Sequence, residues 1–308
     1  MPITGLNLAL SNRCPGRCVF CPAERGRKDP GGMPPALVER MVEEVTGSTW
    51  PWRVKSIQLG ENGDALMNPD FLSIARLLRK RMPGARINLT TNLFNMTPDI
   101  AQAILRERLL NGLQLNVDGH DAETYEAQKR LPYARVMEAL RDFLEARERR
   151  WPDFPMSINV LTLTDYCAAI KRRYGRMPLA APAVVPHSSF EQVRESLSWL
   201  PESVPVHRLS AFAWAERRME GEFNGANSQC PQLSRVETEA FISPSGLWYP
   251  CCLDSNQDQA FGSVCEKGLL GLYNSPERAD FLRKLRDRKF QAIGYPCDRV
   301  DFCRGSAA

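Results

Sequence analysis

The sequence predicts an α/β fold in which six parallel strands alternate with helices in a partial, incompletely closed barrel, followed by a small cysteine-rich α+β domain with a β-hairpin. Two observations support this prediction. Apolar stretches of strand length and of helix length alternate along the first part of the 308 residues, which is typical of parallel sheets with right-handed crossovers. Several strands also carry polar residues on their second face, where a closed barrel packs branched apolar side chains.

The strands are recognised by alternation. In the first one, Leu6, Leu8 and Leu10 share one face, and polar or small residues lie on the other. The predicted strands are residues 4–11, 54–60, 85–92, 111–118, 156–162 and 205–212. Their polar face includes Asn7, Ser56, Gln58, Asn88, Thr90, Gln114, Asn116, Asp118, Ser157 and Asn159. A polar interior fits a wide barrel that holds a polar ligand, and the alternative is a sheet with one solvated face.

The helices are recognised by apolar residues on one stripe. The first carries Val38, Met41, Val42 and Val45 at helical spacing. Further helices are predicted after Pro69, over residues 98–109, from Tyr133 to about Arg149, over residues 189–199, and from near Ser275.

Composition limits the function. The formal net charge of +4 is scattered and no basic tract is long, so no nucleic-acid partner is expected. No apolar run approaches the roughly 18 residues of a membrane span. Ten cysteines without an export signal indicate metal or redox use in a reducing compartment, the cytoplasm. A polar stretch over residues 216–229 marks the predicted boundary between domains 1–220 and 221–308.

Three cysteines follow the first strand directly. Cys14, Cys18 and Cys21 have the spacing C-x3-C-x2-C, and three thiolates cannot complete the four-cysteine shell of an ordinary [4Fe–4S] cluster. A fourth ligand could come from afar, one iron could stay open for a small molecule, or the site could bind zinc. The spacing and its position resemble the radical S-adenosylmethionine (SAM) superfamily. In that family three cysteines hold a [4Fe–4S] cluster whose unique iron is chelated by SAM.

The resemblance implies a partial TIM-like (β/α)6 barrel and a set of SAM-binding residues. Residues 60–69 look like the Gly-Gly-Glu-Pro stretch that binds the SAM amino group, although Asp64 stands where Glu is usual. Polar residues at strand ends and a basic residue would contact the SAM ribose and carboxylate. The implied cofactor-binding residues are Gly60, Asn62, Gly63, Asp64, Thr90, Thr91, Asn92, Asn116, Asp118, Lys129 and Arg130. For these side chains a solvated surface is the alternative.

A second group of cysteines lies near the C-terminus. Cys230 and Cys251 flank a Ser-Pro-Ser-Gly hairpin turn, and Cys297 and Cys303 follow. The pattern resembles the SPASM domain, or its shortened twitch form, and implies one auxiliary [4Fe–4S] cluster held by these four residues. Zinc is the alternative metal. Cys252 and Cys265 compete as ligands, and Cys167 is interpreted as a small buried residue.

The resemblance implies an oxidoreductase-type enzyme that reductively cleaves SAM to a 5′-deoxyadenosyl radical and abstracts hydrogen from its substrate. The electron would come from an external donor such as flavodoxin or ferredoxin. We expect a small polar substrate, such as a sugar or aminocyclitol, because the lumen is polar and the first strand begins near Met1 without room for a leader-binding domain. The expected reaction is an oxidation assisted by the auxiliary cluster, with Asp118 or Arg130 as base.

Two other functions stay open. One is a maturase that modifies a peptide or protein by epimerisation, crosslinking or side-chain oxidation. The other is a non-enzymatic module that binds iron–sulfur clusters or zinc.

Overall fold

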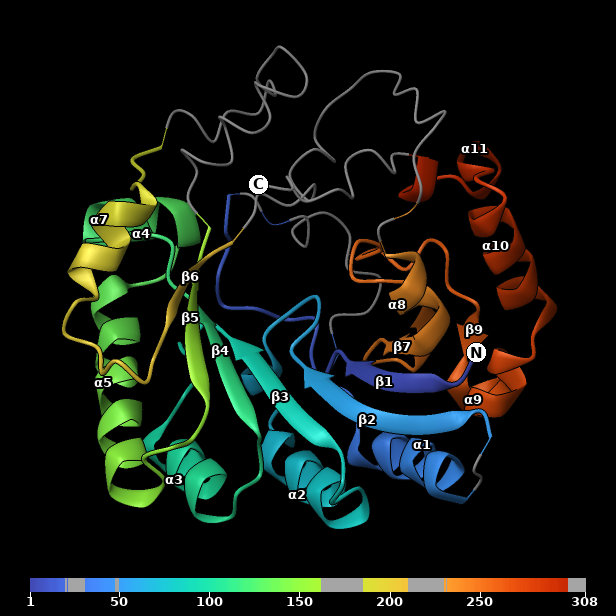
Figure 1. Cartoon of the computed structure of the whole chain (residues 1–308), viewed down its shortest axis with the longest axis horizontal. Coiled ribbons are helices and arrows are strands. Elements are labelled where there is room, and N and C mark those ends of the chain that lie inside the picture. The colour runs from blue at the N-terminus through green and yellow to red at the C-terminus, as the bar shows by residue number, and fades with distance from the viewer. Residues whose placement is uncertain are drawn as a thin grey trace.

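The computed structural model describes residues 1–19, 21, 31–47, 50–161, 185–209, 230 and 232–298. These residues form a sheet of nine strands in the order β6-β5-β4-β3-β2-β1-β7-β8-β9. The sheet curls without closing, so the predicted partial barrel is confirmed (Figure 1). The strands are β1 (Ile3–Leu8), β2 (Trp52–Leu59), β3 (Arg86–Thr91), β4 (Gly112–Asn116), β5 (Met156–Val160), β6 (Val206–Arg208), β7 (Glu239–Ile242), β8 (Leu247–Tyr249) and β9 (Gly262–Ser263).

Helices cover the outer side of this sheet, as Figure 1 shows for α1, α2, α3 and α5. The helices of the N-terminal part are α1 (Pro35–Gly47), the short 3-10 helix η2 (Ala65–Met67), α2 (Phe71–Arg81), α3 (Pro98–Arg106), α4 (Ala122–Lys129), α5 (Tyr133–Arg150) and α7 (Phe190–Ser196). Those of the C-terminal part are α8 (Leu233–Thr238), α9 (Val264–Tyr273), α10 (Pro276–Arg286) and α11 (Phe290–Ile293). Within the described ranges, no helix is long and apolar enough to cross a membrane.

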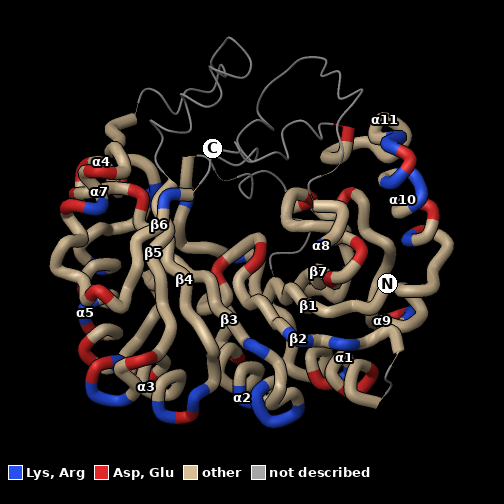
Figure 2. The backbone as a smooth tube through the Cα atoms, viewed as in Figure 1, with Lys and Arg blue, Asp and Glu red and all other residues tan. Residues whose placement is uncertain are grey.

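The burial pattern of the strands follows the alternation in the sequence. In β3, Ile87 and Leu89 are wholly buried, whereas Asn88 and Thr90, which alternate with them, are half-buried. The apolar residues pack against the outer helices, and the polar residues face the lumen. Figure 2 shows charges of both signs gathered on the outer helices rather than on β4 and β5.

Strand β1 is the exception, because it is buried on both faces apart from Thr4. It pairs in parallel with β2 on one side and with β7 of the C-terminal part on the other. The β7–β8 hairpin therefore continues the sheet of the barrel. The sequence predicts this hairpin but not its partner, since a parallel pairing across more than 200 residues leaves no local signal.

Two features of the fold differ from the prediction. The first strand ends at Leu8 rather than residue 11, because the Leu10 carbonyl accepts from Met33 N at 2.8 Å and from Asn68 Nδ2 at 2.8 Å. Helix α4 is not predicted at all. Its segment has no apolar stripe, and it begins instead at a capping box in which Asp121 and Thr124 bond each other's backbone.

Removing core volume from the middle of the sheet should lower stability. Ile57 is wholly buried in β2 between Leu6 of β1 and Ile87 of β3. We expect Ile57→Ala to lower the free energy of unfolding by about 2–5 kcal/mol in urea denaturation of the metal-free protein. Lys55→Ala, an exposed position in the same strand, is the control and should change it by less than about 0.5 kcal/mol. Equal losses in both variants would contradict the assigned core.

Candidate active site

The loop that carries Cys14, Cys18 and Cys21 has no regular structure and is anchored from two sides. On one side, Arg17 N donates to Lys129 O at 3.0 Å, and Val19 N donates to Gln128 O at 2.9 Å. These carbonyls end helix α4, where carbonyl groups have no partner within the helix. Helix α4 therefore provides the docking surface for the cysteine loop.

On the other side, the loop rests on residues that follow β2. Asp64 N donates to Arg13 O at 2.9 Å. A Cβ atom on Gly63 would lie 2.1 Å from Ser11 O, so only glycine allows this approach. Gly60 has a positive φ of 99°, and its Cβ would lie 2.2 Å from Thr90 O. The two glycines let the loop after β2 pack between the cysteine loop and β3.

Asp64 ties this loop to the end of β3. Its buried carboxylate accepts hydrogen bonds from Leu66 N at 3.0 Å, from Thr91 Oγ1 at 2.9 Å and from Asn92 N at 3.0 Å. Burial raises the pKa of Asp64, and these hydrogen bonds oppose the increase. The carboxylate is thus engaged within the protein, and a direct contact of Asp64 or Thr91 with SAM stays a prediction.

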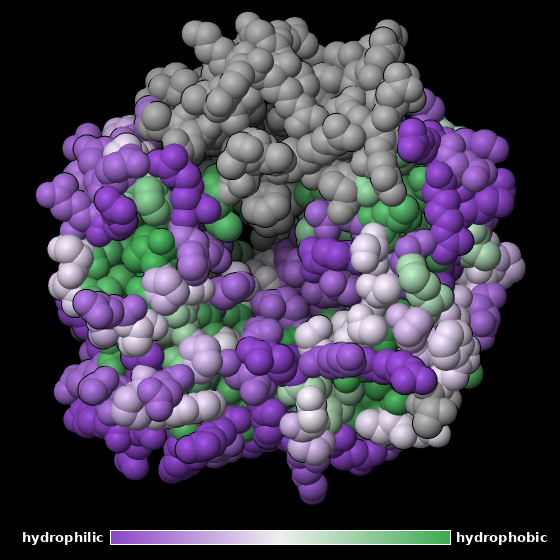
Figure 3. All heavy atoms as spheres, viewed as in Figure 1, coloured by the Kyte–Doolittle hydropathy of each residue, from purple (hydrophilic) through white to green (hydrophobic). Residues whose placement is uncertain are grey.

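Asn92 and the polar strand residues border the lumen. Asn92 Nδ2 donates to Cys14 Sγ at 3.4 Å, which places this predicted SAM contact beside the cysteine loop. Thr90 Oγ1 accepts from Gln58 Nε2 at 3.0 Å, and Asn116 lies at the end of the neighbouring β4. In Figure 3 the molecule is hollowed in the middle of the face shown, and hydrophilic residues border much of the hollow.

A buried ion pair joins β4 to α4. Lys129 Nζ lies 2.7 Å from Asp118 Oδ2, and the two side chains are 4% and 1% exposed. Asp118 Oδ1 also accepts from Leu161 N at 2.8 Å, just after β5. Arg130, by contrast, is exposed and ends α4 in the left-handed conformation. Lys129 is therefore the cation buried at the loop, and catalytic roles for Asp118 and Arg130 stay predictions.

Two thiols of the loop, Cys14 and Cys18, have raised pKa values in the metal-free protein. Burial raises the pKa of Cys18 to about 12, and the Lys129 ammonium partly opposes the increase. Burial also raises the pKa of Cys14, with a contribution from Asp64. A thiol must lose its proton to bind iron, so cluster binding here releases protons.

The residues around the loop fit an iron–sulfur cluster and SAM. Four buried polar atoms near it accept or donate no hydrogen bond within the described part of the chain: Asn12 Oδ1, Asn116 Oδ1, Tyr125 Oη and Gln128 Oε1. Such orphaned groups are expected where a bound group completes a site. No three His, Cys, Asp or Glu side chains of the described residues lie close enough for a single metal ion. A cubane cluster binds its thiolates through several irons, so the three cysteines of the loop are compatible with one.

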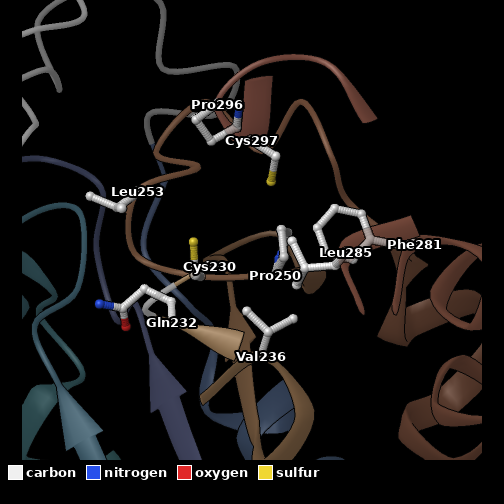
Figure 4. Close-up of a pocket in the computed structure, with 10 residues that line it drawn as sticks. Cys230, Gln232, Val236, Pro250, Leu253, Phe281, Leu285, Pro296 and Cys297 are labelled. Atoms are coloured by element: carbon white, nitrogen blue, oxygen red, sulfur yellow. The ribbon is translucent and has the colours of Figure 1, made fainter. Parts of the chain in front are cut away.

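The second cysteine group lines a pocket whose empty space of about 350 Å³ includes open solvent. Three buried cysteines line this pocket. Cys230 precedes α8, Cys251 follows β8, and Cys297 follows α11. Figure 4 shows the sulfur atoms of Cys230 and Cys297 pointing into the same space. Burial raises the pKa of Cys251 to about 12 and also raises that of Cys230. Cys303, the fourth predicted ligand, and Cys167 lie outside the described residues.

The competing cysteines lie elsewhere. Cys265 is exposed, and a Cβ on Gly246 in the hairpin turn would lie 3.2 Å from its Sγ. Cys251 follows the opposite end of β8, so the hairpin separates Cys265 from the pocket. Cys252 does not line the pocket either. Its neighbour Cys251 does, as the sequence predicts.

Polar contacts join the two parts of the chain at the lumen. Asn7 Nδ2 of β1 donates to Glu239 Oε2 of β7 at 2.8 Å, and Arg235 Nε of α8 donates to the same carboxylate at 3.0 Å. Asn62 Nδ2, after β2, donates to Tyr249 Oη of β8 at 3.2 Å. The sequence does not predict the role of Arg235, Glu239 and Tyr249, because that role depends on the pairing of β1 with β7.

Comparisons with known families agree with this arrangement. The model of the radical SAM superfamily matches residues 8–171. The SPASM model, described as an iron–sulfur cluster-binding domain, matches residues 230–300. These matches confirm both family resemblances, the enzyme class, and the [4Fe–4S] and SAM cofactors expected from them.

Two sequence relatives are matched over almost the whole chain. The mycofactocin maturase MftC of Mycobacterium ulcerans (strain Agy99) is 23% identical over 319 residues, which cover 97% of this chain and 81% of the relative. The mycofactocin maturase MftC of Mycobacterium tuberculosis (strain CDC 1551 / Oshkosh) is 22% identical over 318 residues, covering 97% and 77%.

Solved structures share the fold at low identity. BtrN in complex with AdoMet and 2-DOIA has a TM-score of 0.56 at 16% identity, and the match covers 98% of this chain and 93% of that one. Streptococcus suis SuiB bound to precursor peptide SuiA has a TM-score of 0.57 at 14% identity, covering 91% and 67%. The enzyme anSMEcpe with bound AdoMet and Cp18Cys peptide has a TM-score of 0.58 at 14% identity, covering 92% and 83%.

The expectation of a small sugar-like substrate is wrong. The relatives matched over 97% of the chain are maturases, and two of these structures hold peptides. The physical reason is that the lumen is lined by the amides Gln58, Gln114, Asn116 and Asn159. Amide side chains donate and accept, so they match the N–H and C=O groups of a peptide backbone as well as sugar hydroxyls.

Removing the three thiols of the loop should remove one cluster only. We expect the triple variant Cys14→Ala, Cys18→Ala, Cys21→Ala to form no 5′-deoxyadenosine from SAM under dithionite, because no open iron site remains. Its iron content after anaerobic reconstitution should fall from about eight to about four per chain, the share of the C-terminal site. Undiminished SAM cleavage would refute the assignment, and a wild-type chain that holds zinc instead of the second cluster would refute the auxiliary site.

Breaking the ion pair should destabilise the protein even without metal. In Asp118→Asn the buried Lys129 ammonium loses its partner, and we expect a loss of about 3–5 kcal/mol in urea denaturation of the metal-free chain. The double variant with Lys129→Met removes both charges and should lose less than the sum of the single variants. If Asp118→Asn leaves stability unchanged while it abolishes turnover, Asp118 acts as a catalytic group instead.

Proposed function

The chain belongs to the radical SAM superfamily, and from this premise we propose that it is a maturase that modifies a peptide or protein substrate. The observation that carries the proposal is the match of 97% of the chain to mycofactocin maturases. The fold shared with SuiB and anSMEcpe, both solved with peptides, supports it.

The residues of the proposed site divide into two groups. Cys14, Cys18 and Cys21 hold the first cluster, and Cys230, Cys251 and Cys297, with Cys303, hold the auxiliary one. When bound, the first cluster and SAM supply a 5′-deoxyadenosyl radical that takes a hydrogen atom from the substrate. The loop after β2 and the polar ends of β3 and β4 orient SAM, and the curled sheet shields the lumen from water.

The polar face of the sheet is compatible with an extended peptide chain. Its amide and hydroxyl side chains recur on successive strands in register, with Gln114 beside Ser157 and Asn116 beside Asn159. A row of alternating donors and acceptors is complementary to a peptide backbone. We infer that the peptide lies along this lumen, between the two cysteine groups.

The cellular setting follows from the thiol ligands. Free cysteine ligands need a reducing compartment, so we place the protein in the cytoplasm with flavodoxin or ferredoxin as its electron donor. We keep the division into domains 1–220 and 221–308, with the continuous β1–β7 pairing as the link between them.

A direct test uses short, ribosomally synthesised peptides that are encoded next to the gene of this protein. With reconstituted enzyme, SAM and dithionite under anaerobic conditions, we expect one of them to change mass and to raise 5′-deoxyadenosine formation at least tenfold. The triple cysteine variant is the control and should leave the peptide unchanged. The proposal fails if no peptide is altered or stimulates SAM cleavage while a sugar or aminocyclitol does.

A further inference from the structure

Tyr125 of α4 carries a buried hydroxyl that no contact among the described residues explains. Tyr125 is wholly buried in α4, and its Oη has no hydrogen-bond partner within the described residues. Buried tyrosine hydroxyls nearly always have one, because an unsatisfied polar group is costly to bury. The position therefore calls for a partner outside the described residues, such as a bound group.

Tyr125 lies close to the cysteine loop. The loop is anchored at the C-terminal end of α4, where Arg17 N donates to Lys129 O and Val19 N donates to Gln128 O. Tyr125 lies one turn before this end of the helix.

The ring of Tyr125 is fixed. Its centroid lies 5.4 Å from that of Tyr133, and a Cβ on Gly119 would lie 2.4 Å from the Tyr125 Cα. Burial raises the pKa of Tyr125. The Lys129 ammonium opposes the increase, and the Asp118 carboxylate and, when ionised, the Cys18 and Cys14 thiols add to it. The phenol stays protonated beside those thiols, so it keeps a proton to donate.

We propose that the Tyr125 hydroxyl donates a hydrogen bond to a sulfur of the first cluster site and thereby raises the reduction potential of that cluster. The acceptor is the Cys18 thiolate or an adjacent sulfide. Hydrogen bonds to sulfur stabilise the more negative, reduced state and raise the potential. Of the four orphaned atoms around the loop, the other three are amide oxygens, which only accept. Tyr125 Oη is the one among these four atoms that can donate a hydrogen bond to a sulfur.

The test compares Tyr125→Phe with Tyr133→Phe in the reconstituted full-length chain. Tyr133 is the matched control, because its ring packs on Tyr125 but its hydroxyl donates to His120 O at 3.1 Å. The midpoint potential is measured by dye-mediated titration with electron paramagnetic resonance, following the signal that changes when SAM is added. No substrate is needed, so the result is independent of the peptide proposal.

We expect Tyr125→Phe to lower the potential, so that at a fixed applied potential the ratio of reduced to oxidised cluster falls about tenfold, equivalent to about 59 mV for a one-electron couple. Tyr133→Phe should leave it unchanged. An unchanged potential in Tyr125→Phe, or an equal shift in both variants, would overturn the proposal.

Thermal unfolding of the metal-free variants gives a second readout. Without the cluster the Tyr125 hydroxyl has no partner, so Tyr125→Phe should be at least as stable as the wild-type chain. Tyr133→Phe loses a hydrogen bond and should melt at a lower temperature. If Tyr125→Phe is the less stable of the two, the hydroxyl is bonded within the apoprotein, and the proposal fails.

Discussion

The whole site depends on how a loop without secondary structure is held in place. The cysteine loop is bonded at one side to the carbonyls of Gln128 and Lys129, and at the other it lies against Gly63. The first contact needs the free end of a helix, and the second needs a residue without a side chain. The sheet then brings these anchors together, because β2 and β4 lie two strands apart. Three thiols are thereby presented from a fixed backbone.

Sequence patterns predict the parts of this arrangement that depend on neighbouring residues. The alternation from Leu6 to Leu10 and the spacing of the three cysteines indicate the first strand and the cluster loop. Helix α4 escapes prediction because Tyr125 is the one large apolar residue among its eight. Lys129 is expected to face the cofactor, yet it pairs with Asp118, a contact that depends on how β4 and α4 pack. The substrate class escapes too, since an amide-lined lumen is complementary to sugars and peptides alike.

Strand β1 sets the relation between the two cysteine groups. It leads directly into the first group, and its pairing with β7 positions the hairpin that precedes Cys251. Asn7, Glu239 and Arg235 reinforce this pairing on the lumen side, and Asn62 with Tyr249 adds a bond from the loop after β2. The region between the two cysteine groups is thus made by both parts of the chain.

The raised pKa of Cys18 also bears on how this thiol reacts before a cluster is bound. Attack on peroxides and disulfides is carried out by thiolates, and a thiol with a pKa near 12 is almost never a thiolate at neutral pH. Cys18 is therefore slow to oxidise while it waits for iron, although it lies close to Cys14 and Cys21. The packing that presents the loop to a cluster also lowers the reactivity of Cys18, which is measurable as slow alkylation of this thiol.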